Sequence, residues 1–84
     1  MLSIKNDTQK KYDEVNIESV IQLNKGEIID IFYFGNLIKE NCLILKTIQD
    51  QYYEKGLIIY LNGIVKETID LENQEGLWIK KIKY

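Results

Sequence analysis

The chain contains no His, Arg, Pro or Ala, and its only cysteine is Cys42. Without His, no side chain exchanges protons near neutral pH in its unperturbed state, and no imidazole is present to bind a metal. Without Arg, there is no planar guanidinium to hold a phosphate or carboxylate through two parallel hydrogen bonds. An A+T-biased genome would give the same absences, because Ile, Lys, Asn and Tyr are abundant. The chemistry is missing in either case, and we expect a protein that is not an enzyme.

Other absences narrow the class of protein further. No apolar run approaches the roughly 18 residues that a membrane-spanning helix needs, and residues 1–11 hold no apolar core of a signal peptide. A single cysteine forms no intrachain disulfide, so we expect a cytoplasmic protein, and Cys42 in the run Cys-Leu-Ile-Leu is expected to be a buried thiol. No glycine-rich phosphate loop or metal motif is present, so no cofactor or metal is expected. The net charge of −2 makes nucleic acid an unlikely partner.

The 84 residues fit one small domain, residues 1–84, of the α+β class with mostly β structure. Asn16 followed by Ile17, Val20 and Ile21 at helical spacing predicts a short N-terminal helix over about 17–24, which Gly26 ends.

After Gly26 the residues become β-branched and aromatic, which predicts about five antiparallel strands. Lys39-Glu40-Asn41 interrupts the second strand as a bulge or bend would, and Asn62-Gly63 predicts a type I′ hairpin turn. Such a meander is compatible with a small SH3-like or Sm-like barrel, or with a flat sheet carrying the helix on one face. The expected strands cover residues 27–34, 37–48, 57–61, 64–71 and 77–84, with a tight turn at Gly35-Asn36.

The candidate binding residues are tyrosines and lysines around the third strand and a tryptophan and lysine in the last. Adjacent strand residues point to opposite faces, so one of Tyr52 and Tyr53 should be available to a partner. Trp78 and Lys80 share one face of the last strand, although large aromatic residues more often anchor a core or an interface. The full candidate set is Tyr52, Tyr53, Lys55, Tyr60, Trp78 and Lys80.

Strands with apolar residues on both faces present more apolar surface than one short helix covers, so we expect either a closed sheet or self-association. Of the two we favour self-association, into a homo-oligomer. The favoured function is a binding or inhibitory module that occupies a protein partner. Its context would be an accessory protein of a phage or plasmid, of the anti-defence or immunity type. Two alternatives remain open: a small-ligand protein that sequesters a nucleotide between subunits, and an Sm-like or OB-like binder of single-stranded RNA.

Overall fold

The structure is a computed structural model that describes residues 10–72 and 74–83. Its elements are one 3-10 turn and five strands, so the expectation of a mostly β chain with five antiparallel strands is confirmed. In chain order they are η1 (Val20–Gln22), β1 (Ile28–Tyr33), β2 (Asn36–Ile48), β3 (Leu57–Asn62), β4 (Val65–Asp70) and β5 (Leu77–Lys81).

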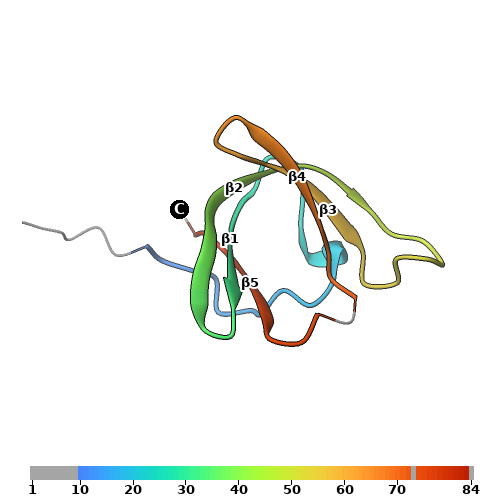
Figure 1. The fold of residues 1–84 in the computed structure, drawn as a ribbon, viewed down its shortest axis with the longest axis horizontal. Coiled ribbons are helices and arrows are strands. Elements are labelled where there is room, and N and C mark those ends of the chain that lie inside the picture. The colour runs from blue at the N-terminus through green and yellow to red at the C-terminus, as the bar shows by residue number, and fades with distance from the viewer. Residues whose placement is uncertain (1–9, 73, 84) are drawn as a thin grey trace, which may run out of the picture.

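The five strands form one antiparallel sheet in the order β4-β3-β2-β1-β5 (Figure 1). Strands β1 to β4 run as a meander, and β5 returns to pair with β1 on the far side. The sheet curls strongly, yet β4 and β5 remain its two edges and do not pair with each other. The sheet is therefore open and is not a hydrogen-bonded barrel.

Bulges bend the sheet where the sequence breaks its apolar runs. Between the pairs Ile29↔Cys42 and Ile31↔Lys39, two residues of β2 oppose the single residue Asp30 of β1. One of them, Asn41, has a positive φ of 56°. The interruption expected at residues 39–41 is therefore confirmed as a bulge.

The predicted helix over residues 17–24 is wrong, because only Val20–Gln22 are helical. Ser19, rather than Asn16, is the N-cap, and both Ser19 and Leu23 have extended backbones. The Val20 N–H donates to Lys55 O at 2.9 Å, so its hydrogen bond ties the turn to a loop. Of the apolar residues whose spacing predicted a helix, Ile17 and Val20 are buried, but Ile21 is 79% exposed. Tertiary contacts satisfy an extended segment instead.

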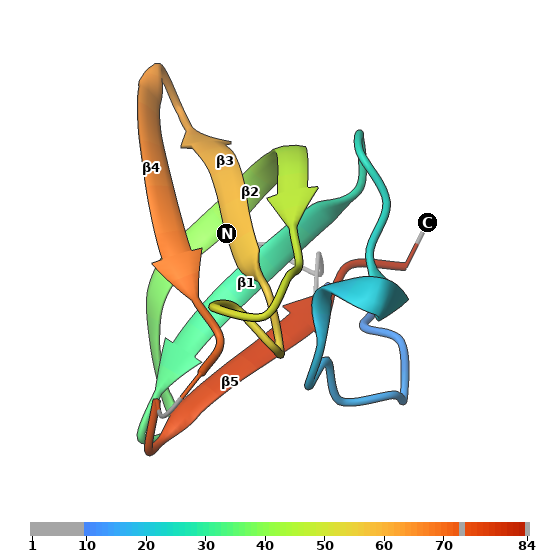
Figure 2. The same cartoon turned by 90° about the vertical axis from the view of Figure 1, so that its right-hand side faces the viewer.

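The chain before η1 runs along β5. Tyr12 bridges Ile82 in antiparallel fashion, and the Asp13 N–H donates to Lys81 O at 2.9 Å. The Ile17 N–H likewise donates to Ile79 O at 3.3 Å. Residues 10–17 thus cover much of the outer side of β5, as Figure 2 shows for the blue segment beside the red strand.

The β3–β4 hairpin lies where Asn62-Gly63 predicted it, with the turn one residue later. Asn62 pairs with Val65, so the two turn residues are Gly63 and Ile64. Gly63 has a positive φ of 66°, while Ile64 does not. A positive φ at the first turn residue alone is the pattern of a type II′ turn rather than the expected type I′.

A single core fills the inside of the curl. β1 is buried on both faces at Ile29, Asp30 and Ile31, so it buries a carboxylate as well as apolar side chains. In the described part of the chain, no helix is long and apolar enough to cross a membrane. The buried apolar residues are Ile17, Val20, Leu23, Ile29, Ile31, Cys42, Ile44, Ile58, Tyr60, Leu71 and Ile79.

Candidate binding site on strands β1 and β5

An aromatic surface lies on the outer side of the sheet, over β1 and β5. Cross-strand pairing places Phe32 opposite Trp78, and Ile31 opposite Ile79. Ile31 and Ile79 are buried inside, so their neighbours along each strand point outward. Trp78 remains 52% exposed despite its size. A half-exposed tryptophan on a rigid strand is available for contact with another molecule.

The β1–β2 turn adds a second exposed ring to this surface. The turn residues are Phe34 and Gly35, with φ values of 48° and 83°, as a type I′ turn requires. The expected turn at Gly35-Asn36 is thus displaced by one residue. Left-handed backbone costs a non-glycine residue about 1–2 kcal/mol, and Phe34 is 63% exposed. Strain retained at an exposed aromatic tip is typical of a functional position.

Gly76 lets the Phe34 ring lie directly on the backbone that precedes β5. A Cβ placed on Gly76 would lie 2.6 Å from Phe34 Cζ, which is inside van der Waals contact. The Phe34 N–H also donates to Gly76 O at 2.8 Å. The ring is therefore fixed at one end of a hollow of about 450 Å³, which is lined by Phe32, Phe34, Gly35, Gly76, Trp78 and Lys80. We call this hollow the aromatic groove.

Lys80 supplies the charge of the groove. Its Nζ lies 5.5 Å from the ring centroids of both Tyr12 and Phe32, at cation–π distance. Those two rings meet edge to face, with centroids 6.0 Å apart. Among residues 10–72 and 74–83, no carboxylate lies within ion-pair distance of Lys80, although Asp30 is its cross-strand neighbour. The ammonium is therefore held in place and has no anionic partner in this part of the chain.

The buried carboxylate of Asp30 accepts a hydrogen bond from the Tyr12 hydroxyl and so positions the Tyr12 ring beneath that lysine. Asp30 is 0% exposed and accepts hydrogen bonds from the Tyr12 hydroxyl at 2.7 Å, the Asn41 N–H at 2.8 Å and Lys10 Nζ at 3.0 Å. Burial alone would raise the pKa of the Asp30 carboxyl, but these three donors outweigh it and lower the pKa. Asp30 is thus a satisfied structural anion, and no further donor is needed to explain it.

Asp30 also shifts the pKa values of the titratable groups that donate hydrogen bonds to it. Burial and the hydrogen bond to Asp30 raise the pKa of Tyr12 to about 12. Burial would lower the pKa of Lys10, but its hydrogen bonds to Asp30 and Glu40 outweigh burial and raise it. The network therefore keeps Tyr12 neutral and Lys10 charged across the whole physiological range, and neither is suited to proton transfer.

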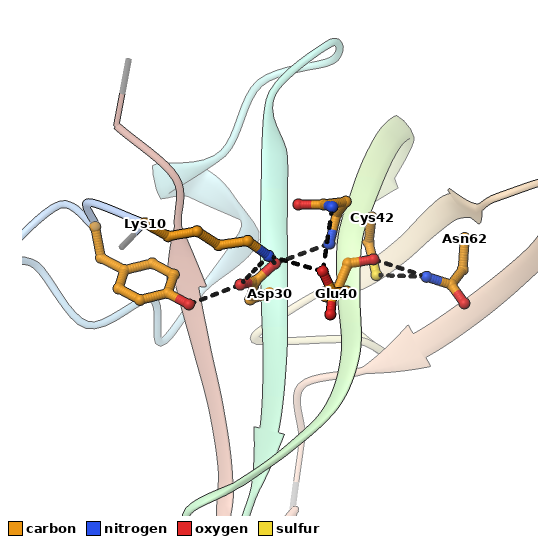
Figure 3. A network of polar contacts seen from close by, with 7 residues as sticks. Lys10, Asp30, Glu40, Cys42 and Asn62 are labelled. Carbon is orange, nitrogen blue, oxygen red and sulfur yellow. Dashed lines mark hydrogen bonds and ion pairs between the residues drawn. The ribbon is translucent and has the colours of Figure 1, made fainter. Parts of the chain in front are cut away.

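The far end of this network holds Cys42. Asn62 Nδ2 donates to Glu40 O at 2.9 Å and lies 3.7 Å from Cys42 Sγ (Figure 3). Burial, reinforced by the charge of Asp30, raises the pKa of the Cys42 thiol to about 11. A buried thiol with so high a pKa is a poor nucleophile. Within the described residues, moreover, no group of three or more His, Cys, Asp or Glu side chains could hold a metal ion.

The structure brings together only two of the six candidate residues, Trp78 and Lys80. Tyr52 and Tyr53 lie in the loop after β2 rather than on a strand, so the argument from opposite faces does not apply; Tyr52 is 78% exposed and Tyr53 half-buried. Tyr60 is a core residue, 3% exposed, whose hydroxyl donates to Glu67 at 3.3 Å. Lys55 lines a different hollow, on the side of η1 and Leu71.

Sequence reasoning missed Phe32 and Phe34, which form the other half of the groove. The signal for Phe34 was its position directly before Gly35. A two-residue turn that contains Gly35 can also contain Phe34, and this places an aromatic ring at the tip of the hairpin. Phe32 lies within the strand expected over residues 27–34, and nothing in its local sequence marks it as a binding residue. Comparison of the chain with protein-family models, curated proteins and solved structures found no match, so the function is argued from this site alone.

Proposed function

We propose that this protein is a non-catalytic binding module that acts by occupancy. Its aromatic groove would hold a segment of a partner protein in which an apolar side chain lies next to a carboxylate. The observation that carries the proposal is the exposed Trp78 flanked by Phe32 and Phe34, with the ammonium of Lys80 at its side. This ammonium has no carboxylate partner among residues 10–72 and 74–83.

The aromatic rings supply the apolar part of this recognition. Tryptophan is the residue type most enriched among the side chains that carry binding energy at protein interfaces. Trp78 sits on a strand and Phe34 on a two-residue turn, so neither has to be ordered when a partner binds. A preformed aromatic groove therefore loses little conformational entropy on association.

Lys80 supplies the preference for an acidic partner. Its ammonium is fixed over Tyr12 and Phe32, and no carboxylate of the described residues neutralises it. A carboxylate from a partner would complete the ion pair on a partly desolvated surface, where such pairs favour specificity. The bound segment is accordingly acidic and apolar.

Charge also argues for a protein rather than a nucleic acid. Among the residues that the structure describes, Lys80 is the only cation that lines the aromatic groove, and the chain as a whole has a net charge of −2. Binding to single-stranded nucleic acid combines stacked aromatic rings with a row of cations along the backbone path. The aromatic groove has the aromatic rings but lacks a row of cations. An inhibitory effect would follow where the captured segment is one that the partner needs for its own contacts.

The test is a peptide-display selection carried out in parallel on the wild-type protein, Trp78→Ala and Tyr52→Ala. We expect the wild type to enrich peptides with an aromatic or large aliphatic residue next to Asp or Glu. Synthetic versions of those peptides should shift the fluorescence of Trp78, which is the only tryptophan in the chain. Tyr52→Ala is the matched control, because Tyr52 is an exposed aromatic residue outside the groove.

The charge requirement is tested with Lys80→Gln, which removes the ammonium without placing a second carboxylate opposite Asp30. This variant should lose the acidic peptides and keep its fold, because Lys80 forms no ion pair among the described residues. Peptides that bind Trp78→Ala as well as the wild type would contradict the proposal. So would quenching of Trp78 by a single-stranded oligonucleotide at low salt with no peptide response, which would identify a nucleic-acid binder instead.

A further inference from the structure

Strand β4 leaves one long side of the sheet open. It pairs with β3 on one side only and ends the strand order, whereas the opposite edge strand, β5, is covered by residues 10–17 (Figure 2). In residues 10–72 and 74–83, no backbone hydrogen bond reaches the outer side of β4. An exposed edge of this kind is a template on which another strand can pair.

The register of the β3–β4 hairpin shows which backbone groups face outward. The Leu71 N–H donates to Gly56 O at 3.0 Å, directly beyond the pair Leu57↔Asp70. In an antiparallel pair the direction of the backbone groups alternates from one residue to the next. The odd-numbered residues of β4 therefore bond to β3. The N–H and C=O groups that face away from the sheet belong to Lys66, Thr68 and Asp70.

These three residues are complementary to themselves when the strand is reversed. If a second β4 pairs antiparallel with Thr68 opposite Thr68, Lys66 lies opposite Asp70, and Asp70 lies opposite Lys66. This register joins all three outward-facing residues in hydrogen-bonded pairs, which gives about six hydrogen bonds between the chains. Registers centred on Lys66 or Asp70 pair fewer residues and place like charges opposite each other, which is destabilising.

We propose that the protein forms a two-fold symmetric homodimer through this edge, with β4 of one copy added to β4 of the other around Thr68. The side chains of Lys66 and Thr68 are exposed in the single chain and that of Asp70 is half-buried, so the two cross-strand ion pairs form at the surface of a continuous sheet. The same register places Val65, which is 52% exposed, opposite Leu71 of the second copy.

The dimer does not depend on the aromatic groove. The groove lies over β1 and β5, and β4 is the strand at the other edge of the sheet. Self-association would leave two grooves free in each dimer. Two linked sites raise the apparent affinity for a partner that offers two copies of the bound segment.

The test reverses one charge of the ion pair at a time and then mixes the two variants. In Lys66→Asp alone, both cross-strand pairs become Asp opposite Asp, and in Asp70→Lys alone, both become Lys opposite Lys. Each variant should raise the dimer dissociation constant by at least about tenfold, measured by sedimentation equilibrium. An equimolar mixture of the two variants restores two opposite-charge pairs and should form a heterodimer, which native mass spectrometry separates by mass.

The mixture also guards against a folding artefact, because the Asp70 carboxylate accepts a hydrogen bond from the Glu72 N–H at 2.8 Å and its loss could weaken the single chain. Mixing changes neither variant, so a heterodimer reports the interface alone. Thr68→Pro is the second probe, since it removes an N–H that points away from β3. This variant should be monomeric and retain the wild-type circular dichroism spectrum.

Hydrogen exchange gives a reading at single residues. The amides of Lys66, Thr68 and Asp70 should become protected as the wild-type concentration rises, while the Glu67 amide is protected at every concentration. The proposal is overturned if the mixture shows only the behaviour of its separate components. It is also overturned if exchange at those three amides does not change with concentration. Trp78→Ala should leave the dimer unchanged.

Discussion

The Tyr12 hydroxyl lies 2.7 Å from Asp30 Oδ2, and this hydrogen bond ties the segment before the sheet to a charge at its centre. Asp30 has no exposed surface, and on β1 it lies between the bulge of β2 and its cross-strand partner Lys80 on β5. The ammonium of Lys80 lies over the face of the same tyrosine ring. The buried anion therefore determines where the cation of the aromatic groove lies.

Replacing Asp30 with Asn tests how much the buried anion contributes to the stability of the fold. The amide cannot accept hydrogen bonds from Lys10, Tyr12 and Asn41 together, and it leaves the Lys10 ammonium with only Glu40. We expect the free energy of unfolding to fall by about 3 kcal/mol, as measured by urea denaturation followed through Trp78 fluorescence. Glu40→Gln is the control, because Glu40 is 57% exposed in its ion pair with Lys10, and it should cost at most about 1 kcal/mol. Equal losses in the two variants would contradict this account.

Alkaline titration should separate Tyr12 and Tyr60 from an ordinary tyrosine. Burial, with Asp30 near Tyr12 and Glu67 near Tyr60, raises the pKa of each to about 12 from 10.0. A raised folded pKa contributes stability that is fully present below pH 10.0 and is lost as pH rises towards about 12. In tyrosinate absorbance at high pH, Tyr12→Phe should remove the contribution of one late-titrating group. A late phase as large in Tyr12→Phe as in the wild type would refute the assignment.

Phe34→Asn should make the protein more stable and a weaker binder. Asn adopts the left-handed conformation far more readily than Phe, and Asn-Gly is the preferred type I′ pair. The thermal midpoint should rise, corresponding to a gain of about 1 kcal/mol, since most of the Phe34 ring is already in solvent. Affinity for the selected peptides should fall at the same time. A lower midpoint would show that the contact of the ring with Gly76 stabilises the hairpin more than the backbone strain opposes it.

The Cys42 thiol should be inert in the native protein. It is fully buried, and its pKa of about 11 leaves almost no thiolate at neutral pH. A thiol reagent such as iodoacetamide should label the native chain only as fast as it unfolds, and should label it rapidly in concentrated urea. Fast labelling of the native protein would mean that the β2–β3 region opens without global unfolding.

The features that could be predicted from the sequence were those determined by a few neighbouring residues. Asn62-Gly63 predicted the position of the β3–β4 hairpin, because glycine readily adopts a positive φ. Lys39-Glu40-Asn41 predicted the position of the bulge, because these polar residues interrupt the apolar run of the strand. The helix at 17–24 failed for the opposite reason. Ile17 and Val20 have helical spacing, but their N–H groups bond to Ile79 and Lys55, which are distant in sequence.

The groove could be predicted only in part for the same reason. Trp78 and Lys80 alternate on one strand, so their shared face follows from the sequence. Their neighbours Phe32 and Tyr12 arrive through the pairing of β5 with β1 and through the bridge to Ile82, which no local pattern encodes. The burial of Asp30 depends on the same long-range pairings, so its role was invisible in the sequence.

The docking of residues 10–17 on β5 sets an order of events in folding. The earliest described residues of the chain pair with nearly the last, as in the bond between the Lys83 N–H and Lys11 O. On the ribosome, β1 has β2 as its neighbour long before β5 emerges, and the edge of β1 that pairs with β5 stays uncovered until then. Contacts between such distant residues form late and slow the folding of small proteins. The hairpins of β1–β4 are therefore expected to form first, and the step that assembles the groove is the same step that closes the domain.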